Sequence, residues 1–214
     1  MYPAFNPSTT DYVSRCNAST PLTVSIGAPS GTAVSVDYQP WQAGIFDDTV
    51  SLAQGQDVAV AVLPPSGPET AYYIRCLPSD FPNWGVQQTA PSQAAGFVGM
   101  VVGEGSPLPT SSHCTVFNNQ GVPVWWSPTL FALYCTVLPD GNIGWIFNGN
   151  LEEHRLDGST LTTISPLSGG LADGHDLLVL PNGDYVLVAD TTRSGVDLSA
   201  ELGPGSARPR SRIP

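Results

Sequence analysis

The chain has 214 residues, of which 12% are charged and 41% are apolar, and its formal net charge is −11. This apolar content suffices for a packed core, whereas 22 Gly and 21 Pro disfavour long helices. All seven basic residues are Arg, and so few cations in a strongly negative field exclude binding to phosphate backbones, so we expect no nucleic-acid partner. The longest apolar run, Ala94–Gly103, is too short to span a membrane.

Short segments in which apolar and polar residues alternate fill residues 1–84. They predict β-strands at 22–26, 33–36, 58–62 and 72–76. Gly- and Pro-rich breakers separate these segments, and no helical period is present. The pattern predicts a small antiparallel β-sandwich over 1–84. The segment Leu77–Trp84 contains two prolines and is predicted to be the linker to a second domain.

A repeat is visible in residues 85–203, because Asn119–Trp126, Pro139–Ile146 and Pro181–Val188 align with one another. Each has a two-residue turn that ends in Gly and then a strand with large residues, as in β-hairpins. Asp157-Gly158 adds a fourth turn of this kind. The step from Gly141 to Gly183 is 42 residues, the length of one four-stranded propeller blade. We therefore expect an all-β chain with part of a β-propeller after the sandwich, and a single β-meander sandwich is the alternative.

The length of the repeat region and the last residues are both unusual. About 110 residues supply two to three blades, whereas a closed propeller needs at least four. Residues 204–214 break the strand pattern and contain three of the seven Arg. A truncated or misread gene end explains both features, and a basic interaction tail is the alternative for 204–214.

Four cysteines lie in strand-like segments, in two pairs with similar neighbours. Cys16 and Cys76 both follow a Tyr-x-x-Arg pattern, and Cys114 and Cys135 both precede Thr-Val. We predict the disulfides Cys16–Cys76 and Cys114–Cys135, with four reduced core thiols as the alternative. No C-x-x-C or H-x₃-H spacing is present, so no metal site is expected. Disulfides would indicate a secreted or extracytoplasmic protein, although no signal peptide is visible in this sequence.

His175 is the candidate functional residue. It lies at the start of a predicted strand, which in a propeller would line the central channel. Asp173 and Asp176 flank it and could fix its tautomer and raise its basicity. The alternative is a structural histidine that bonds a loop between blades.

The other two histidines, His113 and His154, lie in hairpin strands with no acidic or histidine partner at useful spacing. We predict structural roles for both. The acidic pairs Asp47-Asp48 and Glu152-Glu153 are predicted to be solvated loop residues, because adjacent residues on a strand point to opposite faces.

Several of these segments resemble one family. Asp173–Leu177 followed by Leu180–Asp184 resembles the H-D-L…L-P-N-G signature of arylsulfotransferase-like propellers. Thr115–Trp126 is similar to the opening blade of those proteins, and Glu153–Gly158 is similar to the strand and turn between the two motifs. The N-terminal strands, with Arg75–Pro82, look like the cadherin-like sandwich that precedes such propellers in secreted bacterial proteins.

The resemblance implies a six-bladed propeller that moves a sulfuryl group from a phenolic sulfate donor to a phenol acceptor, with no cofactor. The family uses a sulfohistidine intermediate, and His175 matches its channel histidine that binds or stabilises the sulfuryl group. Nothing in this sequence matches the family's H-x-N-S segment with the nucleophilic histidine. We therefore expect the chain alone to be inactive or nearly so. A non-catalytic cell-surface propeller that binds a ligand or protein partner is the alternative.

Overall fold

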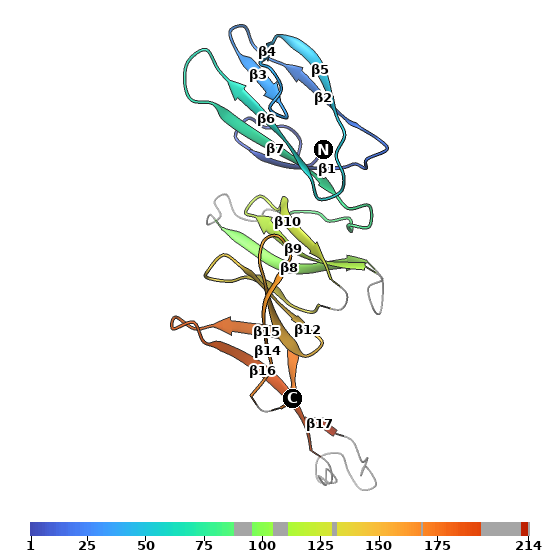
Figure 1. Cartoon of the computed structure of the whole chain (residues 1–214), viewed down its shortest axis with the longest axis vertical. Coiled ribbons are helices and arrows are strands. Elements are labelled where there is room, and N and C mark those ends of the chain that lie inside the picture. Colours follow the sequence, from blue (N-terminus) through green and yellow to red (C-terminus); the bar gives the residue numbers. More distant parts are fainter. Residues whose placement is uncertain (88–95, 105–110, 130–131, 168, 194–210, 214) are drawn as a thin grey trace. The chain divides into compact units, whose positions relative to one another are not determined.

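A computed structural model describes residues 1–87, 96–104, 111–129, 132–167, 169–193 and 211–213 of the chain (Figure 1). Every regular element in these ranges is a β-strand, which confirms the expected all-β class. The strands form five sheets, and none of the five closes on itself. Within the described ranges there is no helix with the length and apolar character that crossing a membrane requires. The chain divides into two packing units, 1–98 with 102–128, and 99–101 with 129–214.

Two sheets share a core in the N-terminal part of the first unit. The larger sheet has the order β1-β7-β6-β3-β4, with the bounds β1 (Asp11–Arg15), β3 (Ala33–Val36), β4 (Gln42–Ala43), β6 (Asp57–Leu63) and β7 (Thr70–Leu77). The smaller sheet pairs β2 (Leu22–Gly27) with β5 (Ile45–Val50). Val24 and Val50 of the smaller sheet pack against the inner residues of the larger one, Val34, Val36, Val58, Val60 and Ile74. These inner residues are the apolar members of the alternating segments, so the four predicted strands are confirmed.

The strand β1 departs from the sequence-based expectation of an antiparallel arrangement. It pairs in parallel with β7, from Asp11 opposite Tyr73 to Arg15 opposite Leu77. Alternation along a strand shows which face is buried but carries no information on strand direction. The parallel pairing is a contact between segments far apart in sequence, which the local pattern does not reveal.

The segment Leu77–Trp84, predicted to be a linker, is buried in part: Ser79, Asp80 and Asn83 are exposed, but its two large apolar residues before Trp84 are buried. Leu77 and Phe81 are each only 1% exposed and pack with Val13 of β1 and with Phe117 and Val122. The last two residues belong to or adjoin a three-stranded sheet with the order β10-β9-β8, made of β8 (Phe97–Glu104), β9 (Ser111–Asn118) and β10 (Pro123–Pro128). Phe81 therefore gives this segment a buried apolar anchor, which its two prolines do not reveal. The packing units are not folding domains, so the expected domain boundary at residue 84 stays a prediction.

The second unit contains a four-stranded antiparallel sheet in chain order. Its strands are β11 (Cys135–Val137), β12 (Ile143–Phe147), β13 (Asn150–His154) and β14 (Thr160–Ile164). A further sheet has the order β15-β16-β17, with β15 (Leu171–Val179), β16 (Tyr185–Arg193) and β17 (Ser211–Ile213). Leu138, Leu151 and Leu177 form the core between these strands. Of the C-terminal segment expected to be irregular, 211–213 form β17, and 204–210 and 214 lie outside the described residues.

The four predicted hairpin turns are all present. Gly141 and Gly183 have φ values of 88° and 87°, and Gly121 and Gly158 are also in the left-handed region. In each turn the glycine N–H donates to the carbonyl three residues earlier, as from Gly141 to Leu138 at 3.0 Å. A positive φ is strained for most residues but not for glycine, so these positions fix the turns.

Candidate functional site

A bulge in β15 presents the sequence around His175. Ala172 pairs with Ala189 and Leu177 pairs with Leu187, but the four residues between them have no partners on β16. Such an interruption of the ladder turns side chains away from their regular positions. Ala172 and Leu177, on either side of the bulge, are buried, whereas His175 and Asp176 are exposed. The bulge therefore exposes His175 and Asp176, although the residues on either side of it, Ala172 and Leu177, are buried in the core.

Asp173 and His175 form a hydrogen-bonded pair within this bulge. Asp173 Oδ1 accepts the backbone N–H of His175 at 2.9 Å and also contacts His175 Nδ1. Residues two apart on a strand share a face, so the pair is a direct outcome of the Asp-Gly-His order. The contact confirms the expectation that an acidic neighbour lies within hydrogen-bond reach of His175, and Asp173 is that neighbour.

The electrostatics of the pair favour one orientation of the ring. The hydrogen bond from His175 lowers the pKa of the Asp173 carboxyl, which keeps it ionised. A carboxylate on Nδ1 holds the proton there in the neutral ring and leaves Nε2 as the reactive nitrogen. The His175 side chain is 80% exposed, so Nε2 is open to solvent. The pair can accept a proton, bind an anion when the ring is charged, or attack an electrophile.

The two neighbours of His175 have different tasks. Asp176 does not contact the ring; its Oδ1 accepts the N–H of Leu177 at 2.8 Å, as expected from the alternation of faces. Gly174 is needed because of a close approach: a Cβ at this position would overlap the side chain of Leu133. Asp176 therefore bonds the backbone at Leu177, where the pairing of β15 with β16 resumes. The absence of a Cβ at Gly174 leaves room for the Leu133 side chain.

The predicted disulfide Cys16–Cys76 is present, with a Cα–Cα distance of 5.5 Å. Cys16 directly follows β1, and in the parallel register Cys76 lies opposite Ser14, two residues before Cys16. Cys114 and Cys135 are also disulfide-bonded, and no described cysteine is free. Two disulfides suggest an extracellular or otherwise oxidising compartment.

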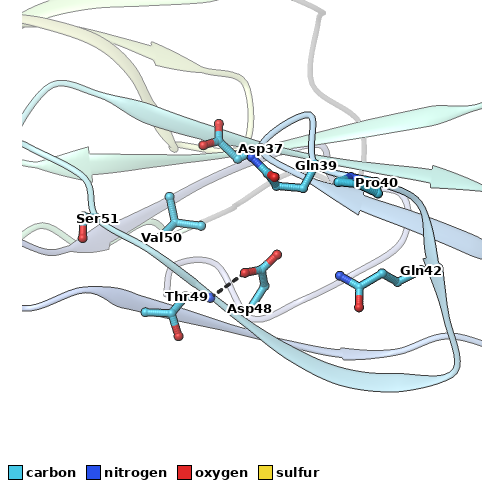
Figure 2. Close-up of a pocket in the computed structure, with 8 residues that line it drawn as sticks. All are labelled: Asp37, Gln39, Pro40, Gln42, Asp48, Thr49, Val50 and Ser51. Carbon is cyan, nitrogen blue, oxygen red and sulfur yellow. Dashed lines mark hydrogen bonds between the residues drawn. The ribbon is translucent and has the colours of Figure 1, made fainter.

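A separate hollow lies in the first packing unit, between the turn that follows β3 and the strand β5 (Figure 2). Its volume is about 470 Å³ and it opens to solvent. The lining residues are Asp37, Gln39, Pro40, Gln42, Asp48, Thr49, Val50 and Ser51. Asp48 Oδ1 accepts the N–H of Thr49 at 2.8 Å. Asp48 was predicted to be a loop acid, but it is a residue of β5 that faces this hollow.

His154 is buried and has both ring nitrogens occupied. Nε2 lies 3.0 Å from Glu152 Oε2, and Nδ1 lies 3.2 Å from the carbonyl oxygen of Gly158. The ring also stacks on Trp145, with the centroids 3.4 Å apart. Because neither nitrogen is available to a substrate or metal, the geometry agrees with the predicted structural role. The stated reason was wrong, however, since Glu152 lies two residues away on the same face of β13, a spacing visible in the sequence.

Glu153 lies on the opposite face of β13 and is only 6% exposed. Its carboxylate accepts hydrogen bonds from Asn142 Nδ2 at 2.8 Å and from the Tyr185 hydroxyl at 3.2 Å. Burial and the charge of Glu153 raise the pKa of Tyr185, so the phenol stays a donor. The prediction that Glu152 and Glu153 are solvated loop acids was therefore wrong, because both are residues of β13 with polar partners: Glu152 contacts His154 on the same strand, and Glu153 is bonded by Asn142 and Tyr185.

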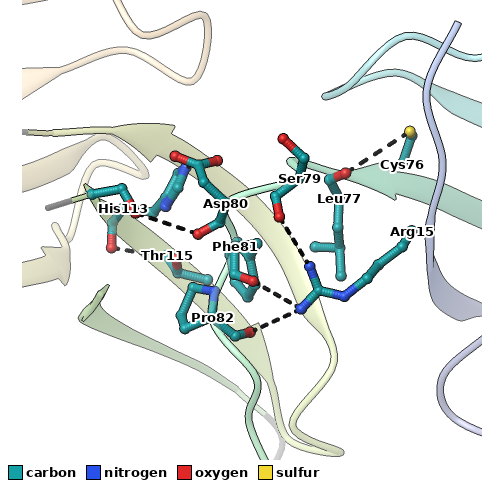
Figure 3. A network of polar contacts seen from close by, with 10 residues as sticks. Arg15, Cys76, Leu77, Ser79, Asp80, Phe81, Pro82, His113 and Thr115 are labelled. Atoms are coloured by element: carbon teal, nitrogen blue, oxygen red, sulfur yellow. Dashed lines mark hydrogen bonds and ion pairs between the residues drawn. The ribbon is translucent and has the colours of Figure 1, made fainter. Parts of the chain in front are cut away.

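His113 is buried in the first unit, next to the segment Leu77–Trp84 (Figure 3). Its Nε2 lies 3.7 Å from Asp80 Oδ1, and its Nδ1 has no hydrogen-bond partner among the described residues. The ring packs against Phe81 with a centroid distance of 5.5 Å. Burial lowers the pKa of His113, and the charge of Asp80 opposes this only in part. The neutral, buried ring fits the predicted structural role, although the Asp80 partner was missed because it is distant in sequence.

Solvent exposure distinguishes His175 from the other two histidines of the chain. Of the three histidines, only His175 presents a ring nitrogen to solvent, and it has an oriented carboxylate beside it. Among the described residues, no group of three or more His, Cys, Asp or Glu side chains is placed to hold a metal ion. Neither a protein-family model, nor a curated protein, nor a solved structure matches this chain.

Proposed function

We propose that the chain takes part in the transfer of a sulfuryl group between phenols, and that His175 binds the sulfuryl oxygens. The observation that carries the proposal is the exposed His175 ring, held through Nδ1 by Asp173 with Nε2 directed to solvent. A protonated ring in this arrangement donates an oriented N–H to a sulfate oxygen and supplies the positive charge that an aryl sulfate needs. The Asp173 carboxylate stabilises that charged form.

In the proposed reaction the S–O bond to the donor phenol breaks, and a new S–O bond to the acceptor phenol forms. The proton of the acceptor hydroxyl balances the departing phenolate. By resemblance His175 matches the family's binding histidine and not its nucleophile, and the other two histidines, His113 and His154, are buried. We therefore propose that His175 holds the group rather than attacks it, and that this chain by itself turns over aryl sulfates slowly or not at all.

We also propose that the N-terminal sheets form a cadherin-like β-sandwich and that residues 85–203 form the first blades of a propeller. The sheet β11-β12-β13-β14 supports the second part, because four antiparallel strands in chain order are what a blade contains. Gly141 joins β11 to β12, and Gly183 joins β15 to β16, so the 42-residue step covers one such set of strands. Two disulfides support a secreted location.

Titration of the protein with 4-nitrophenyl sulfate, followed by NMR of the histidine rings, tests the binding role. We expect the His175 ring signals to shift on addition of the sulfate, because the ring N–H donates to a sulfate oxygen in the proposed complex. His175→Gln should remove the binding, and Asp173→Asn should weaken it. Asp176→Asn is the matched control, since Asp176 does not contact the ring. The same shifts with 4-nitrophenol, or none with the sulfate, would contradict the proposal.

A non-catalytic binding module on a cell surface is the second candidate. The hollow of about 470 Å³ beside β5 favours it, because none of the eight residues that line it is a histidine or cysteine. Binding of a ligand there, with no response of His175 to aryl sulfates, would favour this function over sulfuryl transfer.

A further inference from the structure

The turn that follows β3 places two residues other than glycine in the left-handed backbone region, which glycine favours. Asp37 and Tyr38 both have positive φ values, 49° and 59°, and the N–H of Gln39 donates to the carbonyl of Val36 at 3.0 Å. This is the geometry of a type I′ turn, in which glycine is strongly favoured at the position that Tyr38 occupies. A bulky residue in the left-handed region is destabilising. Such a departure from the local rule is expected where a side chain serves a function other than stability.

The turn is held rigidly despite the strain. The N–H of Asp37 donates to the carbonyl of Ala59 on β6 at 2.8 Å, and the Ser35 hydroxyl donates to the carbonyl of Gln39 at 2.6 Å. Tyr38 is nevertheless 86% exposed, and Trp41 in the same connection is 46% exposed. Neither residue is among those that line the hollow, but the chain neighbours of each on both sides do line it. The connection between β3 and β4 thus both lines a polar hollow and exposes two aromatic rings to solvent.

The lining indicates which ligands the hollow can accept. Its side chains supply two carboxylates, two amides and two hydroxyls. Figure 2 shows Asp48 and Gln42 directed into the space between the turn and β5. None of the eight lining residues is Lys, Arg or His, so an anion such as an aryl sulfate is disfavoured there. Hydroxyl groups of a neutral ligand can donate to the carboxylates and exchange hydrogen bonds with the amides.

We propose that this hollow, together with the two exposed rings of the same connection, binds a neutral saccharide. Planar polar side chains would take the hydroxyl groups, and the exposed faces of Tyr38 or Trp41 would pack against the apolar face of a sugar ring. The hollow of about 470 Å³ is of the size found for small-ligand sites. The proposal is independent of the sulfuryl-transfer proposal, because it involves no residue near His175.

Calorimetric titration with maltohexaose, cellohexaose, xylohexaose and laminarihexaose, each up to about 10 mM, tests the proposal. At least one hexaose should bind. Trp41→Ala should weaken its binding about fivefold to tenfold, and Asp48→Asn should weaken it as well. Tyr38→Gly is the sharpest variant: it should weaken binding and at the same time raise the denaturant midpoint, because glycine relieves the turn.

Two control variants distinguish loss of this binding site from other effects of substitution. Phe97→Ala removes an aromatic ring of comparable exposure, 63%, in the same unit and should leave binding unchanged. His175→Gln should also leave it unchanged, so that failure of one proposal is distinct from failure of the other. The proposal is overturned if no hexaose binds, or if binding survives both Tyr38→Gly and Trp41→Ala. Binding of the cationic probe spermidine without any hexaose would also overturn it, since the carboxylates alone would then explain the site.

Discussion

Replacement of Phe81 by Ala tests whether the segment Leu77–Trp84 is part of the core. Phe81 is 1% exposed, and its ring contacts those of Trp84 and Trp126 with centroid distances of 5.6 and 6.0 Å. Truncation of a fully buried Phe typically costs about 3–5 kcal/mol, and each aromatic pair contributes about 0.5–1.5 kcal/mol beyond its buried area. Because the ring is packed on several sides, we expect a loss of about 4 kcal/mol in the free energy of unfolding of the first unit.

Urea unfolding followed by tryptophan fluorescence measures this loss, since Trp84 and Trp126 both contact the ring that is removed. Phe97→Ala makes the same change at a position that is 63% exposed and should alter stability by no more than about 0.5 kcal/mol. A loss below about 1 kcal/mol for Phe81→Ala would refute the reasoning. The segment would then contribute little to the core of the first unit.

Three further outcomes are expected. Cys16→Ser should lower the free energy of unfolding by about 4 kcal/mol, because it opens the loop of 60 residues that the disulfide closes; urea unfolding against the oxidised wild type measures the loss. Because burial lowers the pKa of His113 below its ordinary 6.5, its contribution to stability is present above that pH and is lost on acidification; His113→Leu should flatten the dependence between about pH 7 and 5, and an unchanged slope would contradict this. Asp173→Asn should change the ring-nitrogen shifts of His175 at about pH 8, and identical spectra would show that Asp173 does not select the tautomer.

Local patterns in the sequence sufficed for the strands and turns but not for their partners. Alternation predicted strands at 22–26 and 58–62, which the structure extends by one or two residues to β2 and β6. Gly141 and Gly183 located their turns, because strands and turns each depend on residues close together in the chain. The parallel pairing of β1 with β7 depends on residues about sixty positions apart and left no local trace.

In the candidate site, too, contacts between residues close in sequence could be predicted and contacts between distant segments could not. The pair Asp173 and His175 could be predicted because its members are two residues apart on one strand. Glu152 and His154 have the same spacing on β13, so their contact was also predictable from the sequence. The contact of His113 with Asp80 and the burial of Phe81 arise only when distant segments meet, so no spacing rule could have found them.

The parallel pairing of β1 with β7 has a consequence for how the chain is made. Asp11–Arg15 leave the ribosome first, but their partners on β7 follow only about sixty residues later. Until then β1 has an unpaired edge, which other chains could join during synthesis or export. The hairpin of β6 and β7 can form locally, and β1 must then add to its outer edge. Oxidation of Cys16 and Cys76 can follow this step and make it irreversible. The time between the synthesis of β1 and its pairing with β7 therefore decides how long the first strand stays exposed to aggregation.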